Sequence, residues 1–151
     1  MRINYYEEQH KNAFEGLRAM ERYARSCGLE MSLIELMKTR ASQLNGCAFC
    51  LDMHTKDARA TGETEQRLYA LNAWRDAPLY SDRERAALEW TEALTMIRHG
   101  VSDELYDRVR AQFSEPEIVN LTAVVVTINA WNRLAISLRF PAPGSYRPPA
   151  A

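Results

Sequence analysis

The sequence predicts an all-α fold, a single-domain helical bundle of about six or seven helices that assembles into an oligomer. Apolar residues recur at spacings of three or four along most of the chain, the period of an amphipathic helix. Only six Gly and six Pro occur in 151 residues, and four of those prolines fall within the last eleven. One run of β-branched residues exists, at 124–128, and a single strand would have no partner.

Four helices are expected in the first half of the chain. Gly28 ends the first, Asn45-Gly46 ends the second, Gly62 follows the third, and the fourth is short. Their expected ranges are residues 6–27, 32–44, 47–61 and 64–72. The first carries an apolar stripe with the expected spacing, made of Tyr6, His10, Ala13, Leu17, Met20, Ala24 and Cys27.

Serine caps mark three further helices, expected at residues 81–98, 102–113 and 114–138. Ser81 and Glu84 form a capping-box pattern, and Pro116 lies in the first turn of the last helix. The helix that follows Ser81 should bury a stripe made of Ala86, Trp90, Ala93, Leu94 and Ile97.

The last helix is apolar on nearly all sides, so it must be buried within the domain or against another subunit. Polar residues such as Asn129 and Arg133 interrupt its stretch 118–138, which makes a membrane span improbable. An α-bundle that self-associates is therefore expected, with no membrane partner.

Composition predicts one domain, residues 1–140, followed by a Pro-rich C-terminal tail, residues 141–151. The net charge of −1 gives no electrostatic reason to expect a nucleic-acid partner. The N-terminal residues lack the apolar stretch of a signal peptide, so a cytoplasmic location is expected. In that compartment cysteines are more often reactive or metal-binding than structural.

The chemistry is concentrated in Cys47, Cys50 and His54, with Glu35 twelve residues upstream of Cys47. If a helix begins at Cys47, the two cysteines are i,i+3 neighbours, and Cys50 and His54 are i,i+4 neighbours on the same face. A helix start favours a thiolate, and the imidazole can take a proton from Cys50 or hold its thiolate. Such a group can cleave an O–O bond: the thiolate attacks the peroxide while a donated proton helps the alkoxide leave.

Other interpretations of these residues exist. Glu35 could form a capping box with Ser32, and the two cysteines with His54 and Glu35 could bind zinc, although these closely spaced ligands would strain a tetrahedral site. Cys27 is expected to be a buried, inert thiol, and the tryptophans, Trp74, Trp90 and Trp131, are expected to pack cores or subunit contacts.

The spacing from Glu35 through Cys47 and Cys50 to His54 resembles the active-site motif of the AhpD-like alkylhydroperoxidases, a branch of the carboxymuconolactone decarboxylase superfamily. The flanking segments 44–47, 50–54, 62–71 and 129–133 are similar to that family too, and the resemblance covers roughly residues 5–140. The true decarboxylases generally lack this cysteine pair, so the resemblance does not imply decarboxylation.

The resemblance implies an all-α protein that forms trimers or hexamers. It implies that Cys50 attacks the peroxide, that Cys47 resolves the sulfenic acid, that His54 accepts the proton and that Glu35 completes the relay through water. Characterised AhpD has a histidine where this chain has Phe49, which makes a simpler relay or weaker peroxidase activity possible.

The leading hypothesis is a thiol-dependent peroxidase or disulfide oxidoreductase that reduces an organic hydroperoxide through Cys47 and Cys50. It needs no cofactor or metal, but it does need a thiol reductant, and the family's precedent is a lipoyl-bearing partner. The alternatives are a non-enzymatic redox sensor or helical assembly protein and, less favoured, a metal-binding protein.

Overall fold

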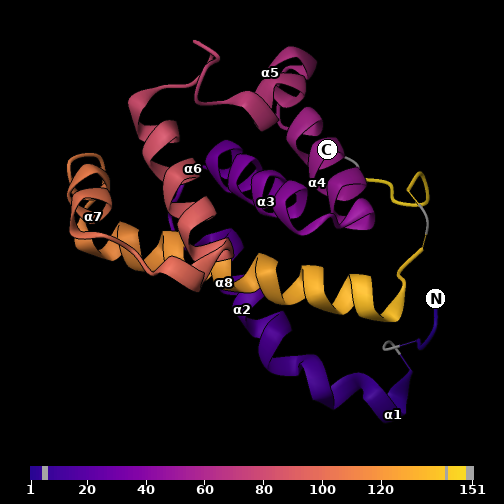
Figure 1. Ribbon diagram of the computed structural model, residues 1–151. Coiled ribbons are helices and arrows are strands. Elements are labelled where there is room, and N and C mark those ends of the chain that lie inside the picture. The colour runs from indigo at the N-terminus through magenta and orange to yellow at the C-terminus, as the bar shows by residue number, and fades with distance from the viewer. Residues whose placement is uncertain (5–6, 142, 149–151) are drawn as a thin grey trace.

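The computed structural model describes residues 1–4, 7–141 and 143–148. All regular secondary structure in these residues is helical (Figure 1). The α-helices are α1 Glu8–Lys11, α2 Glu15–Ser26, α3 Met31–Asn45, α4 Ala48–Ala60, α5 Glu65–Ala70, α6 Asp82–Thr95, α7 Asp103–Arg110 and α8 Glu115–Leu138. Short 3-10 turns follow α1, α5 and α6: η1 Asn12–Phe14, η2 Leu71–Ala73 and η3 Ile97–His99. The described residues thus confirm an all-α fold, with seven helices longer than the single turn of α1.

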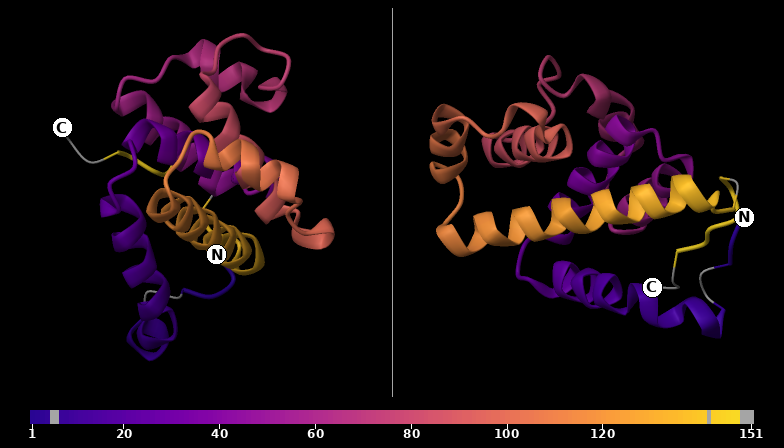
Figure 2. Two further views of the ribbon diagram at one scale, coloured as in Figure 1. Left: turned by 90° about the vertical axis from the view of Figure 1, so that its left-hand side faces the viewer. Right: turned by 60° about the horizontal axis from the view of Figure 1, so that its bottom comes forward.

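Helix α3 is central to the bundle and packs against α4, α6 and α8 (Figures 1 and 2). Its residues from Leu33 to Ser42 are all buried. Ile34 and Met37 belong to the main apolar core with residues of α6, α7 and α8, and Leu36 belongs to a second core with residues of α4 to α6. Because α3 is enclosed in this way, a polar side chain on it faces other side chains rather than solvent.

The first expected helix is instead divided into α1, η1 and α2, because the chain leaves helical geometry at Phe14. Asn12 and Gly16 beside this break are weak helix formers. Of the expected stripe, Ala24 is buried and Met20 is exposed, whereas Tyr6 lies outside the described residues.

Helix α6 has the capping box expected of Ser81 and Glu84, but it ends at Thr95, earlier than expected. The chain then turns through η3, so Ile97 leaves the stripe and is 57% exposed, contrary to the expectation that it is buried. Ala86 and Trp90 are buried as expected.

Helix α8 begins after Ser114 with a capping box and a proline in its first turn, as expected, and contains the β-branched run at 124–128. By length and composition it could cross a membrane, but half of that apolar stretch is buried in the bundle. It packs against α2, α3 and α6, and Figure 2 shows it running across the molecule between them. These contacts are those of a core helix.

A buried polar network fixes the end of α3 to α8. Asn45 Nδ2 donates to the side-chain oxygens of Asn132, at 2.8 Å, and Asn129, at 3.0 Å. Asn132 in turn donates to Ser42 Oγ at 3.1 Å. Gly46 then ends α3 with φ of +70°, a conformation that L side chains rarely adopt, and the chain turns into α4. The network therefore holds the turn that precedes Cys47.

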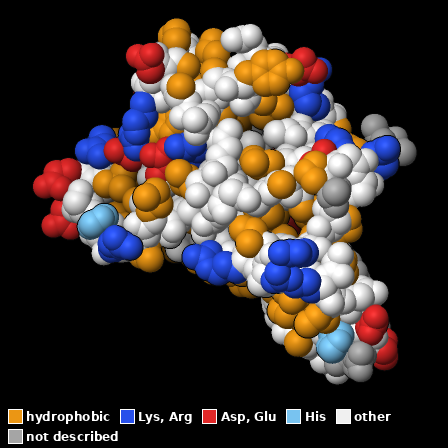
Figure 3. All heavy atoms as spheres, turned by 45° about the vertical axis from the view of Figure 1, so that its right-hand side comes forward, with side chains coloured by type: hydrophobic (Ala, Val, Ile, Leu, Met, Phe, Trp, Pro, Cys, Tyr) orange, Lys and Arg blue, Asp and Glu red, His pale blue; other side chains and the backbone are white. Residues whose placement is uncertain are grey.

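The C-terminal segment, described at residues 140–141 and 143–148, returns along α4. Gly144 N donates to Asp52 Oδ2 at 2.9 Å, and Lys56 Nζ donates to the Tyr146 carbonyl at 3.1 Å. The ring of Phe140 meets that of Phe49 edge-on, with centroids 5.4 Å apart. Figure 3 turns toward the viewer the side of the molecule on which this segment lies, where hydrophobic side chains are spread between those of Lys and Arg.

Candidate active site

Cys47 and Cys50 form a disulfide at the start of α4, with Cα atoms 5.3 Å apart. Cys47 is the N-cap residue of the helix, and its sulfur accepts a hydrogen bond from Cys50 N at 3.4 Å. Both side chains are buried, with Ala135 of α8 beside them. A sulfur at this position faces unpaired helical N–H groups, which stabilise negative charge on it when the bond is reduced.

His54 lies one turn beyond Cys50 on α4, and its Nδ1 is 2.7 Å from Glu35 Oε2 on α3. Both side chains are buried, Glu35 with 1% and His54 with 2% of their surface exposed. Helix α3 begins at Met31, and no side chain caps it. The capping-box interpretation of Glu35 is therefore wrong, and the carboxylate contacts the imidazole directly, where a water-mediated contact was expected.

The electrostatic surroundings keep Glu35 ionised. Burial alone would raise the pKa of its carboxyl group, but the hydrogen bond with His54 and the charges of Lys38 and Arg25 outweigh it, so the pKa lies below its ordinary value. An ionised carboxylate can only accept a hydrogen bond. His54 Nδ1 therefore carries the proton that faces Glu35, and Nε2 of a neutral imidazole is left to accept another.

Asp57, one turn beyond His54 on α4, is an acidic residue of this site that sequence reasoning missed. Its carboxylate lies within 4.8 Å of the nearest ligand atoms of Glu35 and His54, and the side chain is 7% exposed. Tyr146 Oη donates to Asp57 Oδ1 at 2.8 Å. Burial, and then this hydrogen bond, raise the pKa of Tyr146 to about 12, so its hydroxyl remains a donor at neutral pH.

A pocket of about 280 Å³ opens beside Cys50 and His54. Its polar residues lie on α2 and α4 and in the C-terminal segment, and its apolar residues lie on α4, on α8 and just after α8. The polar residues are Glu21, Arg25, Asp57 and Tyr146. The apolar residues are Phe49, Met53, Trp131, Ala135 and Phe140. Trp131, expected to pack a core or a subunit contact, lines this pocket, whereas Trp74 and Trp90 belong to the cores.

Glu35, His54 and Asp57 bring an imidazole and two carboxylates close together, so this cluster could also bind a cation. This set differs from the zinc ligands considered from the sequence. In the described structure the sulfurs of Cys47 and Cys50 are bonded to each other, so neither is available as a thiolate ligand. The remaining cysteine, Cys27, was expected to be buried but is half-buried, and its thiol donates to the Ala24 carbonyl of α2, the helix that it caps.

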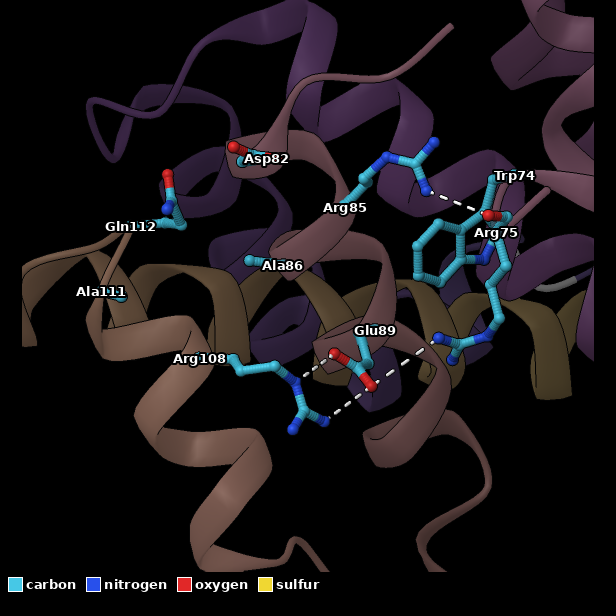
Figure 4. Close-up of a pocket in the computed structure, with 9 residues that line it drawn as sticks. All are labelled: Trp74, Arg75, Asp82, Arg85, Ala86, Glu89, Arg108, Ala111 and Gln112. Carbon is cyan, nitrogen blue, oxygen red and sulfur yellow. Dashed lines mark hydrogen bonds and ion pairs between the residues drawn. The ribbon is translucent and has the colours of Figure 1, made fainter. Parts of the chain in front are cut away.

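A pocket of about 410 Å³ also lies between α6 and α7, far in sequence from the cysteines (Figure 4). Glu89 pairs with two of its arginines: Arg108 Nη2 is 2.8 Å and Arg75 Nη1 is 3.6 Å from Glu89 Oε1. Arg85 donates to the Arg75 carbonyl. These contacts join α6 to its neighbours, and they offer neither a thiol nor an imidazole.

Known proteins are similar to this chain in sequence. The profile of the carboxymuconolactone decarboxylase family matches residues 8–93, which include Glu35, Cys47, Cys50 and His54. The uncharacterized protein YdfG of Bacillus subtilis (strain 168) is 47% identical over 141 residues, which is 91% of this chain and 93% of that protein. The uncharacterized protein YnjA of Escherichia coli (strain K12) is 36% identical over 115 residues, 76% of this chain and 63% of that protein.

Solved structures agree in fold. ATU0492 from Agrobacterium tumefaciens, a protein of unknown function for which a role in antioxidant defence as AhpD has been suggested, superimposes with a TM-score of 0.89. It is 43% identical, and the match covers 94% of this chain and 97% of that one. The debrominase Bmp8 in complex with 2,3,4-tribromopyrrole has a TM-score of 0.80 at 16% identity, covering 90% and 73% of the two chains, and shows only that the fold is shared.

Proposed function

Because the chain belongs to the carboxymuconolactone decarboxylase family, in its AhpD-like branch, we propose that it is a thiol-dependent peroxidase that reduces organic hydroperoxides. The observation that carries this proposal is the buried Glu35–His54 pair one helical turn from a cysteine that forms a disulfide with its i−3 neighbour. A dithiol, an oriented base and an adjoining pocket are what the reaction requires.

In the proposed cycle, the Cys50 thiolate attacks the terminal oxygen of the hydroperoxide. The O–O bond breaks, the alkoxide leaves as an alcohol with one proton, and Cys50 becomes a sulfenic acid. The Cys47 thiolate then attacks the Cys50 sulfur, water leaves, and the Cys47–Cys50 disulfide forms. One hydroperoxide and two thiols thus give one alcohol, one water and one disulfide.

The neighbours of the two sulfurs support this order. His54 shares the pocket with Cys50, so its Nε2 can take the Cys50 proton and return it to the departing alkoxide. Glu35 holds the tautomer that this transfer needs. Cys47, at the helix cap, is placed to carry the thiolate that resolves the sulfenic acid.

Turnover requires an external thiol that supplies two electrons, since the disulfide must be opened after each cycle. We propose a thiol or lipoyl-bearing reductant, in keeping with the family, and a cytoplasmic location in which such thiols stay reduced. Phe49, at the position of the family histidine, packs against Phe140 and supplies no proton. The relay is therefore proposed to run through His54 and Glu35.

The test is mass mapping of alkylatable thiols in the reduced protein, before and after one equivalent of cumene hydroperoxide. We expect rapid loss of two thiols, a linked Cys47–Cys50 peptide and an unchanged Cys27. The Cys50→Ser variant should lose the reaction, whereas Cys47→Ser should hold a sulfenic acid on Cys50 that a dimedone probe captures.

Two results would decide against the proposal. If Cys50→Ser keeps full peroxide turnover, the roles of the cysteines are wrong. If the wild-type dithiol oxidises only slowly and no reductant supports turnover, the protein is better described as a redox sensor, in which the disulfide changes packing or partner binding. A Cys27→Ser variant is the matched control, since it removes a thiol outside the pocket.

A further inference from the structure

The described residues of the C-terminal segment make several contacts with α4, the helix that carries the redox cysteine. Three side chains of α4 bind it within two helical turns: Asp52 accepts from Gly144 N, Lys56 donates to the Tyr146 carbonyl, and Asp57 accepts from Tyr146 Oη. Lys56 Nζ also pairs with Asp52 Oδ1 at 2.8 Å, and this ion pair holds two of the three side chains that bind the segment. The hydrogen bond from Lys56 holds the pKa of Asp52 below its ordinary value, so this acceptor stays charged.

Of these contacts, the hydrogen bond from Tyr146 Oη to Asp57 lies inside the site. Tyr146 lines the pocket together with Cys50 and His54, and its hydroxyl donates to Asp57, which lies close to Glu35 and His54. Phe140, at the start of the same segment, lines the same pocket and packs on Phe49. Residues far apart in the chain thus form one wall over the reacting sulfur.

The size and lining of the pocket determine which substrates can reach Cys50. A volume of about 280 Å³ lies near the lower end of the range of ~300–1,000 Å³ typical of sites that take drug-sized ligands. Apolar side chains, among them Met53, Trp131 and Phe140, line much of it, while His54 and Asp57 are among its polar lining. A short apolar hydroperoxide could place its O–O group toward Cys50 and His54 and its carbon chain against the aromatic rings.

We propose that the C-terminal segment is a wall of the active-site pocket and that Tyr146, anchored by Asp57, is the residue that limits the site to small, apolar substrates. The identity of the substrate as a hydroperoxide rests on the proposed function, whereas the size limit rests on the wall itself. Tyr146 acts through its position and its bond to Asp57, so it is a specificity-determining residue.

The test measures access to the Cys50 sulfur without peroxide. In the reduced Cys47→Ser protein, the alkylation rates of Cys50 by iodoacetamide and by N-(1-pyrenyl)maleimide are compared by peptide mass mapping. Tyr146→Ala should raise the ratio of bulky to small reagent about tenfold, the scale of discrimination by a hydrophobic pocket. Asp57→Ala should raise it in the same direction, but Asp57→Asn should restore it, because the amide oxygen still accepts from Tyr146.

The matched control is Tyr69→Ala, which removes a tyrosine that is 73% exposed on α5 and should leave the ratio unchanged. An unchanged ratio in both Tyr146→Ala and Asp57→Ala would overturn the proposal. The comparison of cumene hydroperoxide with hydrogen peroxide is a second readout, in which Tyr146→Ala should favour the bulkier substrate. If no peroxide oxidises the wild-type protein, the proposed function fails, and the alkylation ratio still decides whether the wall exists.

Discussion

At the scale of single residues, the site depends on one contact between two helices. Glu35 comes from α3 and His54 from α4, and both side chains are buried where the two helices meet. A buried carboxylate is costly unless it is paired, so Glu35 and His54 stabilise each other as well as the tautomer of the imidazole. This coupling makes the carboxylate the most informative position to change.

We expect Glu35→Gln to slow peroxide-dependent oxidation of the dithiol by about a hundredfold, the scale of general acid–base catalysis. Gln keeps the size of the side chain but removes the charge that fixes the proton on His54 Nδ1. The pKa of Glu35 lies below its ordinary value, so the wild-type contact persists through neutral pH and is lost only as the pH falls through that lowered pKa. Stopped-flow measurement of thiol loss checks this, with the exposed Glu104→Gln as a control. Equal rates would exclude Glu35 from the relay.

The sequence could predict Cys47, Cys50 and His54 as a group because their spacing matches helix geometry, whereas Glu35, on the preceding helix, is assigned to the site by the family resemblance. Asp57 follows His54 by three residues, so the same i,i+3 rule would have placed it on this face had it been applied. Tyr146 could not be predicted in this way. It lies in a Pro-rich segment without helical period, and its place depends on tertiary contacts with α4.

At the scale of helices, the ends of α3 and α8 determine where the cysteines lie. The start of α8 is held by Ser114 and Glu117, whose carboxylate accepts from Ser114 N and Oγ, both at 2.8 Å, and pairs with Arg83. The hydrogen bonds that Glu117 accepts from the Ser114 backbone and from Arg83 lower the pKa of its carboxyl group to about 2. Farther along α8, Asn129 and Asn132 hold the end of α3.

The charge on Glu117 should make the stability of the protein depend on pH in acid. Because its folded pKa is lowered from 4.5 to about 2, its contribution is present above pH 4.5 and is lost as the pH falls toward 2. Glu117→Gln keeps an acceptor for Ser114 but loses the ion pair. Wild type should therefore exceed this variant in free energy of unfolding at pH 6, by up to about 1 kcal/mol for a partly exposed pair, and match it near pH 2. Urea unfolding at both values tests this, and a pH-independent difference would contradict it.

Replacing Asn132 with Ala should lower the free energy of unfolding by about 1–3 kcal/mol, because the partly buried amide of Asn45 and the buried hydroxyl of Ser42 each lose a partner. The turn before Cys47 would also loosen, so we expect the disulfide to be reduced faster by dithiothreitol. The control is Ser137→Ala, an exposed position on the same helix. A variant as stable as wild type would mean that the network is not needed to hold α3 on α8.

The helix starts marked by serine caps could be predicted well, and α3 and α4 also begin and end within one residue of their expected ranges, whereas two breaks in the chain could not be predicted. Ser81, Ser102 and Ser114 each precede a helix in the structure, because a side-chain oxygen at that position binds free backbone N–H groups. The break at η1 and the early end of α6 carry no comparable signal. Apolar spacing continues across both, so period alone placed Ile97 in the core.

At the scale of the whole molecule, the outer side of α8 exposes large apolar side chains to solvent. Val119 and Val126, two helical turns apart, are 64% and 54% exposed. Val126 lines a shallow groove with Leu94 and Ile97, next to the exposed Met96. The early turn after α6 therefore moves Ile97 out of the core and adds it to this apolar surface.

We expect a second copy of the chain to cover this surface, in keeping with the trimer or hexamer that the family resemblance implies. Exposed apolar side chains that gather on one helix are typical of subunit interfaces. Val126→Asp would bury a charge without a partner, so it should raise the dissociation constant of the assembly at least about tenfold, or about 1.4 kcal/mol. Size-exclusion chromatography with light scattering across a concentration series measures this, and Tyr69→Asp, an exposed site on α5, is the control. If wild type is monomeric at all concentrations, or if Val126→Asp leaves its assembly unchanged, α8 does not form the interface.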